Sequence, residues 1–254
     1  MDTDRSLALL DSDVDRLVEV AAPALDAAVP SCEPWRVRDL LEHVALVYLH
    51  KVECMRRQAP PEPWPPDVDT DDPVGLVRDG YRALRRELTT RGPAAPSPTW
   101  YPPDQTVGFW YRRMAHETAI HRIDAELATG AVTPVDAELA VDGVDEVLVL
   151  MLAGDWSDEP VEEGDGARVV VTVDGRAWHL QLGRTKVTCA ALASGADPAA
   201  EVESLAAEAD LVLGGDPGAL YRWVWGRGDL DPSDAVGDAS LVPILRRRLA
   251  IATQ

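Results

Sequence analysis

The chain has 254 residues, of which 46% are hydrophobic and 27% charged, and this composition excludes a disordered chain, a fibre and a disulfide-rich miniprotein. A net charge of −20 argues against a nucleic-acid partner, because a phosphate backbone is bound by dense lysine and arginine. No apolar stretch reaches the roughly 20 residues of a membrane span. Three cysteines without a Cys-x-x-Cys pair fit a reducing compartment. We therefore expect a cytoplasmic protein without a membrane partner, as a monomer or homodimer.

Helical periodicity runs through the first 155 residues. Apolar residues recur at three- and four-residue spacing from the start, at Leu10, Val14 and Leu17, as one face of a helix requires. Asp72-Pro73 predicts a helix start, because a capping aspartate followed by proline is typical of one, and Gly92 ends that helix. Helices are expected at about 10–25, 37–57, 73–91, 105–129 and 134–150, with proline-rich loops at 59–70 and 93–103.

The period changes after the acidic segment Asp155–Gly166. Arg168–Val173 and Arg176–Leu182 are β-rich runs, and Asp174-Gly175 between them is a strong two-residue hairpin signal. Further strands are expected around Thr185–Ala190 and Asp210–Leu213, and helices near Pro217–Trp225 and Asp238–Leu249. The sequence therefore predicts an all-helical domain over residues 1–155, followed by a small α+β domain with a mainly antiparallel sheet over residues 167–254.

One helix carries a high density of ionisable residues, in the run Arg113-Met-Ala-His116-Glu117-Thr-Ala-Ile-His121-Arg-Ile-Asp124. His116 and His121 are five residues apart, roughly 140° around a helix, so they do not easily share a metal. Glu117 and His121 are four apart and lie on one face. A carboxylate and an imidazole in this register are a platform of two metal ligands, which needs at least one more ligand from elsewhere.

Three residues of the 37–57 helix are candidates for that ligand: His43, His50 and Cys54. His50 and Cys54 follow His43 by seven and eleven residues, so all three lie on nearly the same face of the helix. A helical bundle can bring this face opposite Glu117 and His121. Two histidines and one glutamate with an open water position would form a zinc site of the catalytic kind. The spacing alone leaves the choice open, and a surface salt bridge between Glu117 and His121 is the alternative.

Both helices contain motifs of a known family. They are Cys32-x-x-Trp35-x-Val37-x-Asp39-Leu40-Leu41-x-His43 and Arg113-x-x-His116-Glu117-x-x-x-His121-Arg122-x-Asp124-Ala125. These motifs resemble the mycothiol-dependent maleylpyruvate isomerase family. The resemblance continues in the C-terminal part, at Ala209-Asp210-Leu-Val-Leu213-x-Gly215-Asp216 and Trp225-Gly226-Arg227-Gly228, and so covers nearly the whole chain.

The resemblance implies both the fold and the site. It implies a DinB-like four-helix bundle followed by a small, sterol-carrier-like α+β domain. It also implies a divalent metal, usually zinc, held by His43, Glu117 and His121, and mycothiol as the cosubstrate. In the family's isomerase an arginine in the matching Gly-Arg-Gly is implicated in activity, which makes Arg227 a candidate catalytic residue; a cation at a helix C-terminus is the alternative.

Three functions are consistent with these residues. The leading prediction is a metal-dependent enzyme that uses a low-molecular-weight thiol for isomerisation of, or transfer to, an electrophilic small molecule. The alternatives are a non-catalytic metal- or ligand-binding protein and a metal-dependent hydrolase. Asp124 is left with two interpretations, as a carboxylate that orients the His121 imidazole or as a solvated side chain.

Overall fold

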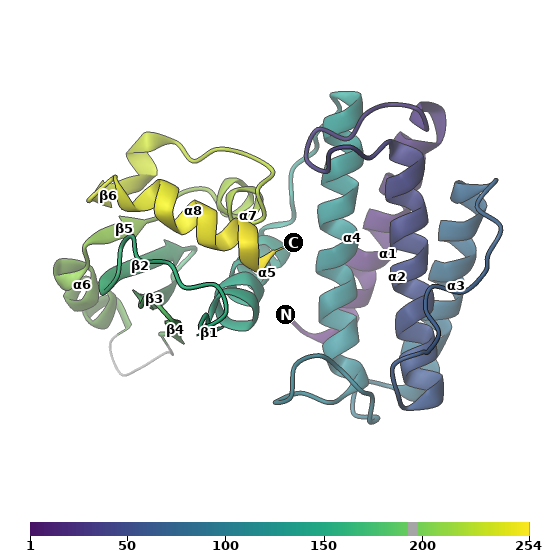
Figure 1. The fold of residues 1–254 in the computed structure, drawn as a ribbon, viewed down its shortest axis with the longest axis horizontal. Helices are drawn as coiled ribbons and strands as arrows, with labels where there is room; N and C mark the ends of the chain where they lie inside the picture. The colour runs from purple at the N-terminus through teal and green to yellow at the C-terminus, as the bar shows by residue number, and fades with distance from the viewer. Residues whose placement is uncertain (193–197, 254) are drawn as a thin grey trace. The chain divides into compact units, whose positions relative to one another are not determined.

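The computed structural model describes residues 1–192 and 198–253, and the chain divides into two compact units, Met1–Pro134 and Val135–Gln254 (Figure 1). The first unit is a bundle of four long helices, as the sequence predicts. They are α1 (Thr3–Ala21), α2 (Val37–Arg57), α3 (Pro73–Arg91) and α4 (Val107–Thr129), with a short 3-10 turn, η1 (Ala22–Ala24), after the first.

Local chemistry sets the ends of these helices. The Asp72 side chain accepts a hydrogen bond from the backbone N–H of Gly75, which caps α3 at the predicted position. Gly92 and Gly130 follow α3 and α4 with positive φ angles of 76° and 71°, a region that glycine enters without steric cost. The predicted starts and stops of α3 and α4 are therefore confirmed to within two residues.

Helix α4 is the central helix of the bundle. Its side chains are buried on every side from Phe109 to Glu126, with the sole exception of Arg112 in that stretch. A helix that is buried all round normally carries apolar residues alone. In α4, ionisable side chains are buried as well, and each must therefore be paired or hydrogen-bonded. This burial concentrates the chemistry of the first unit along one helix.

The second unit combines helices with one mixed sheet. Its helical elements are α5 (Ala137–Asp145), the π-helical η2 (Glu146–Leu152), α6 (Pro198–Glu208), α7 (Pro217–Val224), η3 (Pro232–Asp234) and α8 (Leu241–Ala252). The strands are β1 (Gly154–Asp155), β2 (Ala167–Val173), β3 (Arg176–Leu182), β4 (Lys186–Ala191), β5 (Leu211–Leu213) and β6 (Ala235–Gly237). Among the described residues the strand order is β1-β4-β3-β2-β5-β6, and only β2 and β5 pair in parallel.

The predicted hairpin joins β2 and β3. Val173 pairs with Arg176, and the two residues between them, Asp174 and Gly175, have positive φ angles of 47° and 75°. A type I′ hairpin turn has positive φ angles at both central residues, and its twist matches the twist of the two strands that it joins. The α+β fold class with a mainly antiparallel sheet is confirmed.

Several elements differ from the sequence-based expectation. The fifth helix begins at Ala137 rather than at Pro134, because the side chain of Asp136 accepts from the N–H of Leu139 and caps it there. Helix α6 and strand β6 were not predicted at all. Helix α5 and segment η2, expected with the helical half, belong to the second unit, where they pack on α7, α8 and β4.

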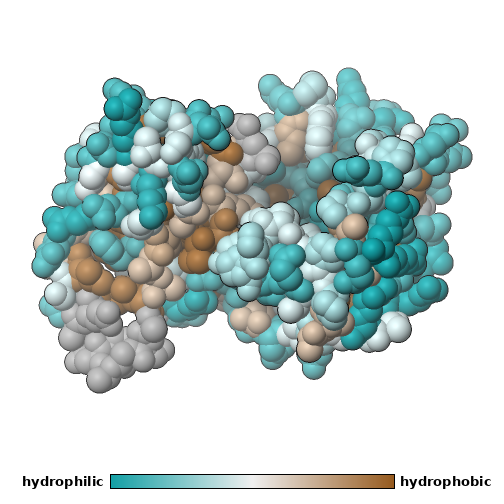
Figure 2. Space-filling view, turned by 60° about the horizontal axis from the view of Figure 1, so that its bottom comes forward, coloured by the Kyte–Doolittle hydropathy of each residue, from teal (hydrophilic) through white to brown (hydrophobic). Residues whose placement is uncertain are grey.

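The surface agrees with the composition. Hydrophilic residues cover much of the visible face, with hydrophobic patches among them (Figure 2), and carboxylates are in excess over lysine and arginine. None of the helices in the described part of the chain is both long and apolar enough to cross a membrane.

Candidate metal centre

Helices α2 and α4 bring three potential metal ligands together. Nε2 of His43 lies 3.4 Å from Oε1 of Glu117, and Nε2 of His121 lies 3.2 Å from the same oxygen. One donor atom from each residue lies within 4.8 Å of the others. Glu117 and His121 share a face of α4 because they are four residues apart, and His43 of α2 meets that face.

The two oxygens of Glu117 have separate partners. Oε2 accepts from Nη2 of Arg113, one turn earlier on α4, whereas Oε1 faces the two histidines. Burial alone raises the pKa of this carboxyl, but Arg113, His121 and His43 outweigh it and hold the pKa well below its usual range. Glu117 is therefore ionised, and Oε1 is oriented toward the imidazoles.

Asp124 fixes the orientation of His121. Its Oδ2 lies 2.9 Å from Nδ1 of His121, and an ionised carboxylate only accepts, so Nδ1 carries the proton and donates it. This leaves Nε2 as the nitrogen that faces Glu117. Burial lowers the pKa of His121, but the hydrogen bonds to Asp124 and Glu117 outweigh this effect and raise the pKa to about 9. The structure thus favours the orienting interpretation of Asp124, which is fully buried.

A loop before α2 supports this carboxylate from the other side. Oγ of Ser31 donates to Oδ1 of Asp124 at 2.5 Å, and Sγ of Cys32 lies 3.6 Å from Oδ2. Trp35 in the same loop packs its ring against His43, with centroids 4.9 Å apart. The family-like motif at Cys32 and Trp35 therefore surrounds the ligand set. Ser31 has no signal in the sequence beyond its nearness to this motif, whereas Arg113 stands in the second motif without an assigned role.

His50 and Cys54, the other candidates for the third ligand, lie elsewhere on α2. Nδ1 of His50 is 3.5 Å from Sγ of Cys54 and 3.2 Å from Nζ of Lys51, and its ring packs on Trp64. In the part of the chain that the structure describes, they join no cluster of three metal-ligating groups. His43 is the histidine that the fold brings to Glu117 and His121.

Arg227 belongs to the second unit, just after α7. Its backbone N–H donates to the carbonyl of Arg222 at 2.7 Å, and Nη1 donates to the carbonyl of Trp225 at 2.6 Å. The guanidinium is thus held near the carbonyl end of α7, where a cation is favoured.

The donor set fits a divalent transition metal. Two imidazole nitrogens and one carboxylate oxygen are the three protein ligands of many catalytic zinc sites. The carboxylate that accepts from the ligand histidine's other nitrogen is a recurrent partner of such sites. The arrangement therefore has the ligands, their orientation and the supporting hydrogen bonds that a metal of this class requires.

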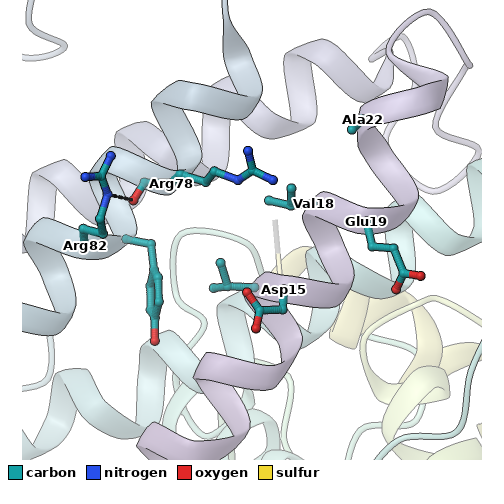
Figure 3. A pocket seen from close by; sticks show the side chains of 8 residues that line it. Asp15, Val18, Glu19, Ala22, Arg78 and Arg82 are labelled. Atoms are coloured by element: carbon teal, nitrogen blue, oxygen red, sulfur yellow. Dashed lines mark hydrogen bonds between the residues drawn. The ribbon is translucent and has the colours of Figure 1, made fainter.

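A separate hollow of about 680 Å³ lies between α1 and α3. Asp15 and Glu19 of α1 and Arg78 and Arg82 of α3 line it, as Figure 3 shows, and none of the three clustered residues does. Its charged side chains are exposed, and Arg82 donates to the carbonyl of Arg78 on its own helix. The candidate site is therefore placed on α2 and α4.

Comparison with known proteins agrees with the fold. No curated protein sequence matches the chain. Crystal structures of the mycothiol-dependent maleylpyruvate isomerase and of a point mutant of it are similar, each with a TM-score of 0.57 over 90% of this chain and 90% of the other. Their identities to this chain are 13% and 12%, so the likeness establishes the fold alone. Residues 7–126 match the model of the mycothiol maleylpyruvate isomerase N-terminal domain family, and this stretch includes all three clustered side chains.

Proposed function

We propose that the protein is a metal-dependent enzyme that activates a low-molecular-weight thiol, mycothiol, for reaction with an electrophilic small molecule. The observation that carries this proposal is the cluster of His43, Glu117 and His121, with Asp124 behind it, inside a domain of a family named for a mycothiol-dependent isomerase. The proposed class of reaction is isomerisation or S-transfer.

The proposed metal is zinc, held by His43, Glu117 and His121. Bound there, it would supply a Lewis acid that lowers the pKa of a small thiol below the roughly 8.5 of a free cysteine, so that the thiolate is available at neutral pH. This thiolate is the nucleophile of the proposal.

The protein's own residues prepare the ligands. Arg113 binds one oxygen of Glu117 and so directs the other toward both histidines. Asp124 holds the proton of His121 on Nδ1 and so keeps Nε2 directed toward Glu117. Because the ligand side chains of α4 are no more than about a tenth exposed, their charges are weakly screened by water. The cluster is thus oriented before any substrate arrives.

Isomerisation and transfer differ in their thiol balance. In isomerisation the thiolate adds to the double bond of the electrophile, the resulting single bond rotates, and elimination restores the double bond and releases the thiol. In transfer the sulfur displaces a leaving group, and one thiol is consumed for each product. Measuring the free thiol during turnover separates the two reactions.

Arg227 is proposed to pair with a carboxylate of the electrophile. A guanidinium binds a carboxylate through two parallel N–H donors, and the bond of Nη1 to the Trp225 carbonyl limits its motion. Replacing Arg227 by Ala should lower kcat/KM for carboxylate-bearing electrophiles more than for neutral ones. Equal losses for the two classes would reduce Arg227 to a helix cap.

The experiment that tests the function measures turnover of an electrophile such as maleylpyruvate with zinc and mycothiol added separately and together. We expect activity only when both are present. The activity should survive replacement of Cys32, Cys54 and Cys189 by serine, because the nucleophile is the small thiol. Activity with zinc alone would favour the alternative function of a metal-dependent hydrolase. A stoichiometric metal without activity toward any electrophile would favour the binding protein.

A further inference from the structure

Lys51 is a partly buried cation of the first unit. It lies on α2, with Nζ 3.2 Å from Nδ1 of His50 and 4.9 Å from the centroid of the Trp110 ring on α4. An ammonium has three N–H donors and no acceptor, so Nδ1 of His50 accepts one of them. The aromatic face attracts the positive charge but satisfies no donor fully.

No carboxylate of the described residues lies within ion-pair distance of Lys51. Burial lowers the pKa of its ammonium, and Cys54 and the Glu117 carboxylate only partly offset this, while the Arg113 guanidinium adds to the lowering of the pKa. A cation that is partly removed from water without a paired carboxylate costs free energy, and such groups concentrate at functional sites. The other lysine of the chain, Lys186, is exposed at the start of β4.

The position of Lys51 relates it to the candidate metal centre. His43 and Lys51 are eight residues apart on α2, and their partners on α4, Glu117 and Trp110, are seven apart in the opposite direction. The two helices are therefore antiparallel, and Lys51 lies about 10–12 Å along the seam from the ligand cluster. The Arg113 guanidinium lies between these two levels, where it binds Glu117.

We propose that Lys51 forms an anion-binding subsite on the α2–α4 seam, which takes a carboxylate of the small molecule that reacts at the metal centre. The ammonium supplies the charge and at least one N–H donor that points at no carboxylate of the protein. Trp110 supplies an apolar wall, and His50 holds the ammonium in place. The subsite deepens the proposed function and rests on it only for the identity of the electrophile.

A purely structural role for Lys51 makes a different prediction. If Lys51 only packs on Trp110 and bonds His50, its replacement changes stability and leaves anion binding as it was. If it forms the subsite, its replacement weakens the binding of carboxylates and leaves the binding of neutral analogues unchanged. The two roles are therefore separated by affinity and not by stability.

The presence of only two lysines allows a direct measurement. Lysine labelled with carbon-13 at Cε gives one side-chain NMR signal for Lys51 and one for Lys186 in the full-length, zinc-loaded chain. Maleate is added as the probe, and maleamide, its neutral diamide, is the control at matched ionic strength. No thiol is present, so no turnover is needed, and failure here is distinct from failure of the proposed enzyme activity.

We expect the Lys51 signal to move saturably with maleate and not with maleamide, and the Lys186 signal to stay fixed. By calorimetry, Lys51→Met should bind maleate about tenfold or more weakly, because a charge-assisted hydrogen bond is lost. Lys51→Arg should retain most of the affinity, and Lys186→Met all of it. A Lys51 signal that does not move at saturating maleate, or a folded Lys51→Met with unchanged affinity, would overturn the proposal.

Discussion

Asp124 is not one of the three candidate metal ligands, but it supports them through hydrogen bonds. Its buried carboxylate accepts from Nδ1 of His121 on one side and from Ser31 on the other. The first bond fixes which nitrogen of His121 faces Glu117. The second ties the loop before α2 to α4, and the same loop packs Trp35 on His43. Both histidines are thus oriented by one set of contacts.

Replacing Asp124 by Asn should weaken metal binding about 10- to 100-fold. An amide is neutral, so it supports the ligand histidine less well, and its side chain has nearly the same shape. Zinc affinity is measured by competition with a chelator. Ser31→Ala is the matched control and should have a smaller effect, because it removes a neutral donor and leaves the carboxylate on His121. An Asn variant with the zinc affinity of the wild type would show that Asp124 does not support the site.

At the residue scale the sequence predicts part of the site from geometry alone. The four-residue spacing places Glu117 and His121 on one face wherever the helix lies. It does not decide between His43 and His50, because both share a face of α2 and the choice depends on how far α2 slides along α4. That offset is set by tertiary packing, and only the family resemblance indicates His43.

At the scale of elements, α1 and α4 are joined by a buried charge network. Glu126 of α4 is fully buried and accepts from Nε of Arg16 at 2.9 Å, from Nη1 of Arg122 at 2.8 Å and from Thr133. Burial raises the pKa of Glu126, but these hydrogen bonds, led by those of Thr133, hold its pKa below the usual value. The network anchors the helix that carries Glu117 and His121.

Replacing Glu126 by Leu should lower the free energy of unfolding by about 3 kcal/mol, because it leaves buried donors without their acceptor. Urea unfolding of the zinc-free chain measures this effect. Arg16→Met is the matched control and should cost less than about 1 kcal/mol, since the Arg16 side chain is 28% exposed and its ion pairs are partly screened. A Glu126→Leu variant as stable as the wild type would contradict the structural role of the network.

The elements that the sequence predicts well are those with local stop signals. Helix ends are marked by the capping side chain of Asp72 and by Gly92 and Gly130, which have positive φ angles. The hairpin is marked by Asp174-Gly175 in the same way, so these signals do not depend on tertiary contacts. Strand β6 was missed because three residues show no periodicity, and it exists by pairing with β5. Helix α6 is rich in alanine and has no clear apolar stripe, so the pattern gave no signal there.

For the whole molecule, the two units raise the question of where the chain divides. The sequence predicts independent domains on either side of Asp155–Gly166, and this division of the chain stays a prediction. The segment is bound to the second unit, since the buried Arg248 donates to the carbonyls of Val161 and Gly183 at 2.9 Å each. Helix α5 and segment η2 make their main contacts with α7, α8 and β4, which belong to the second unit as well.

We therefore expect a fragment of residues 135–254 to unfold cooperatively, and a fragment of residues 167–254 to be poorly folded. The shorter fragment lacks Val147, Leu148 and Leu152, which are fully buried in the second unit. Thermal unfolding followed by circular dichroism compares the two. Equal stability of both fragments would support the division at Asp155–Gly166 that the sequence predicts.

His43, Glu117 and His121 are proposed to hold one metal ion. Elemental analysis of the purified chain after zinc reconstitution tests it most directly, with His43→Ala, His121→Ala and His50→Ala compared under the same conditions. We expect about one zinc per chain in the wild type and in His50→Ala, and loss of stoichiometric zinc in the other two variants. Absence of stoichiometric metal in the wild type, or loss of zinc in His50→Ala with retention in His43→Ala, would contradict it.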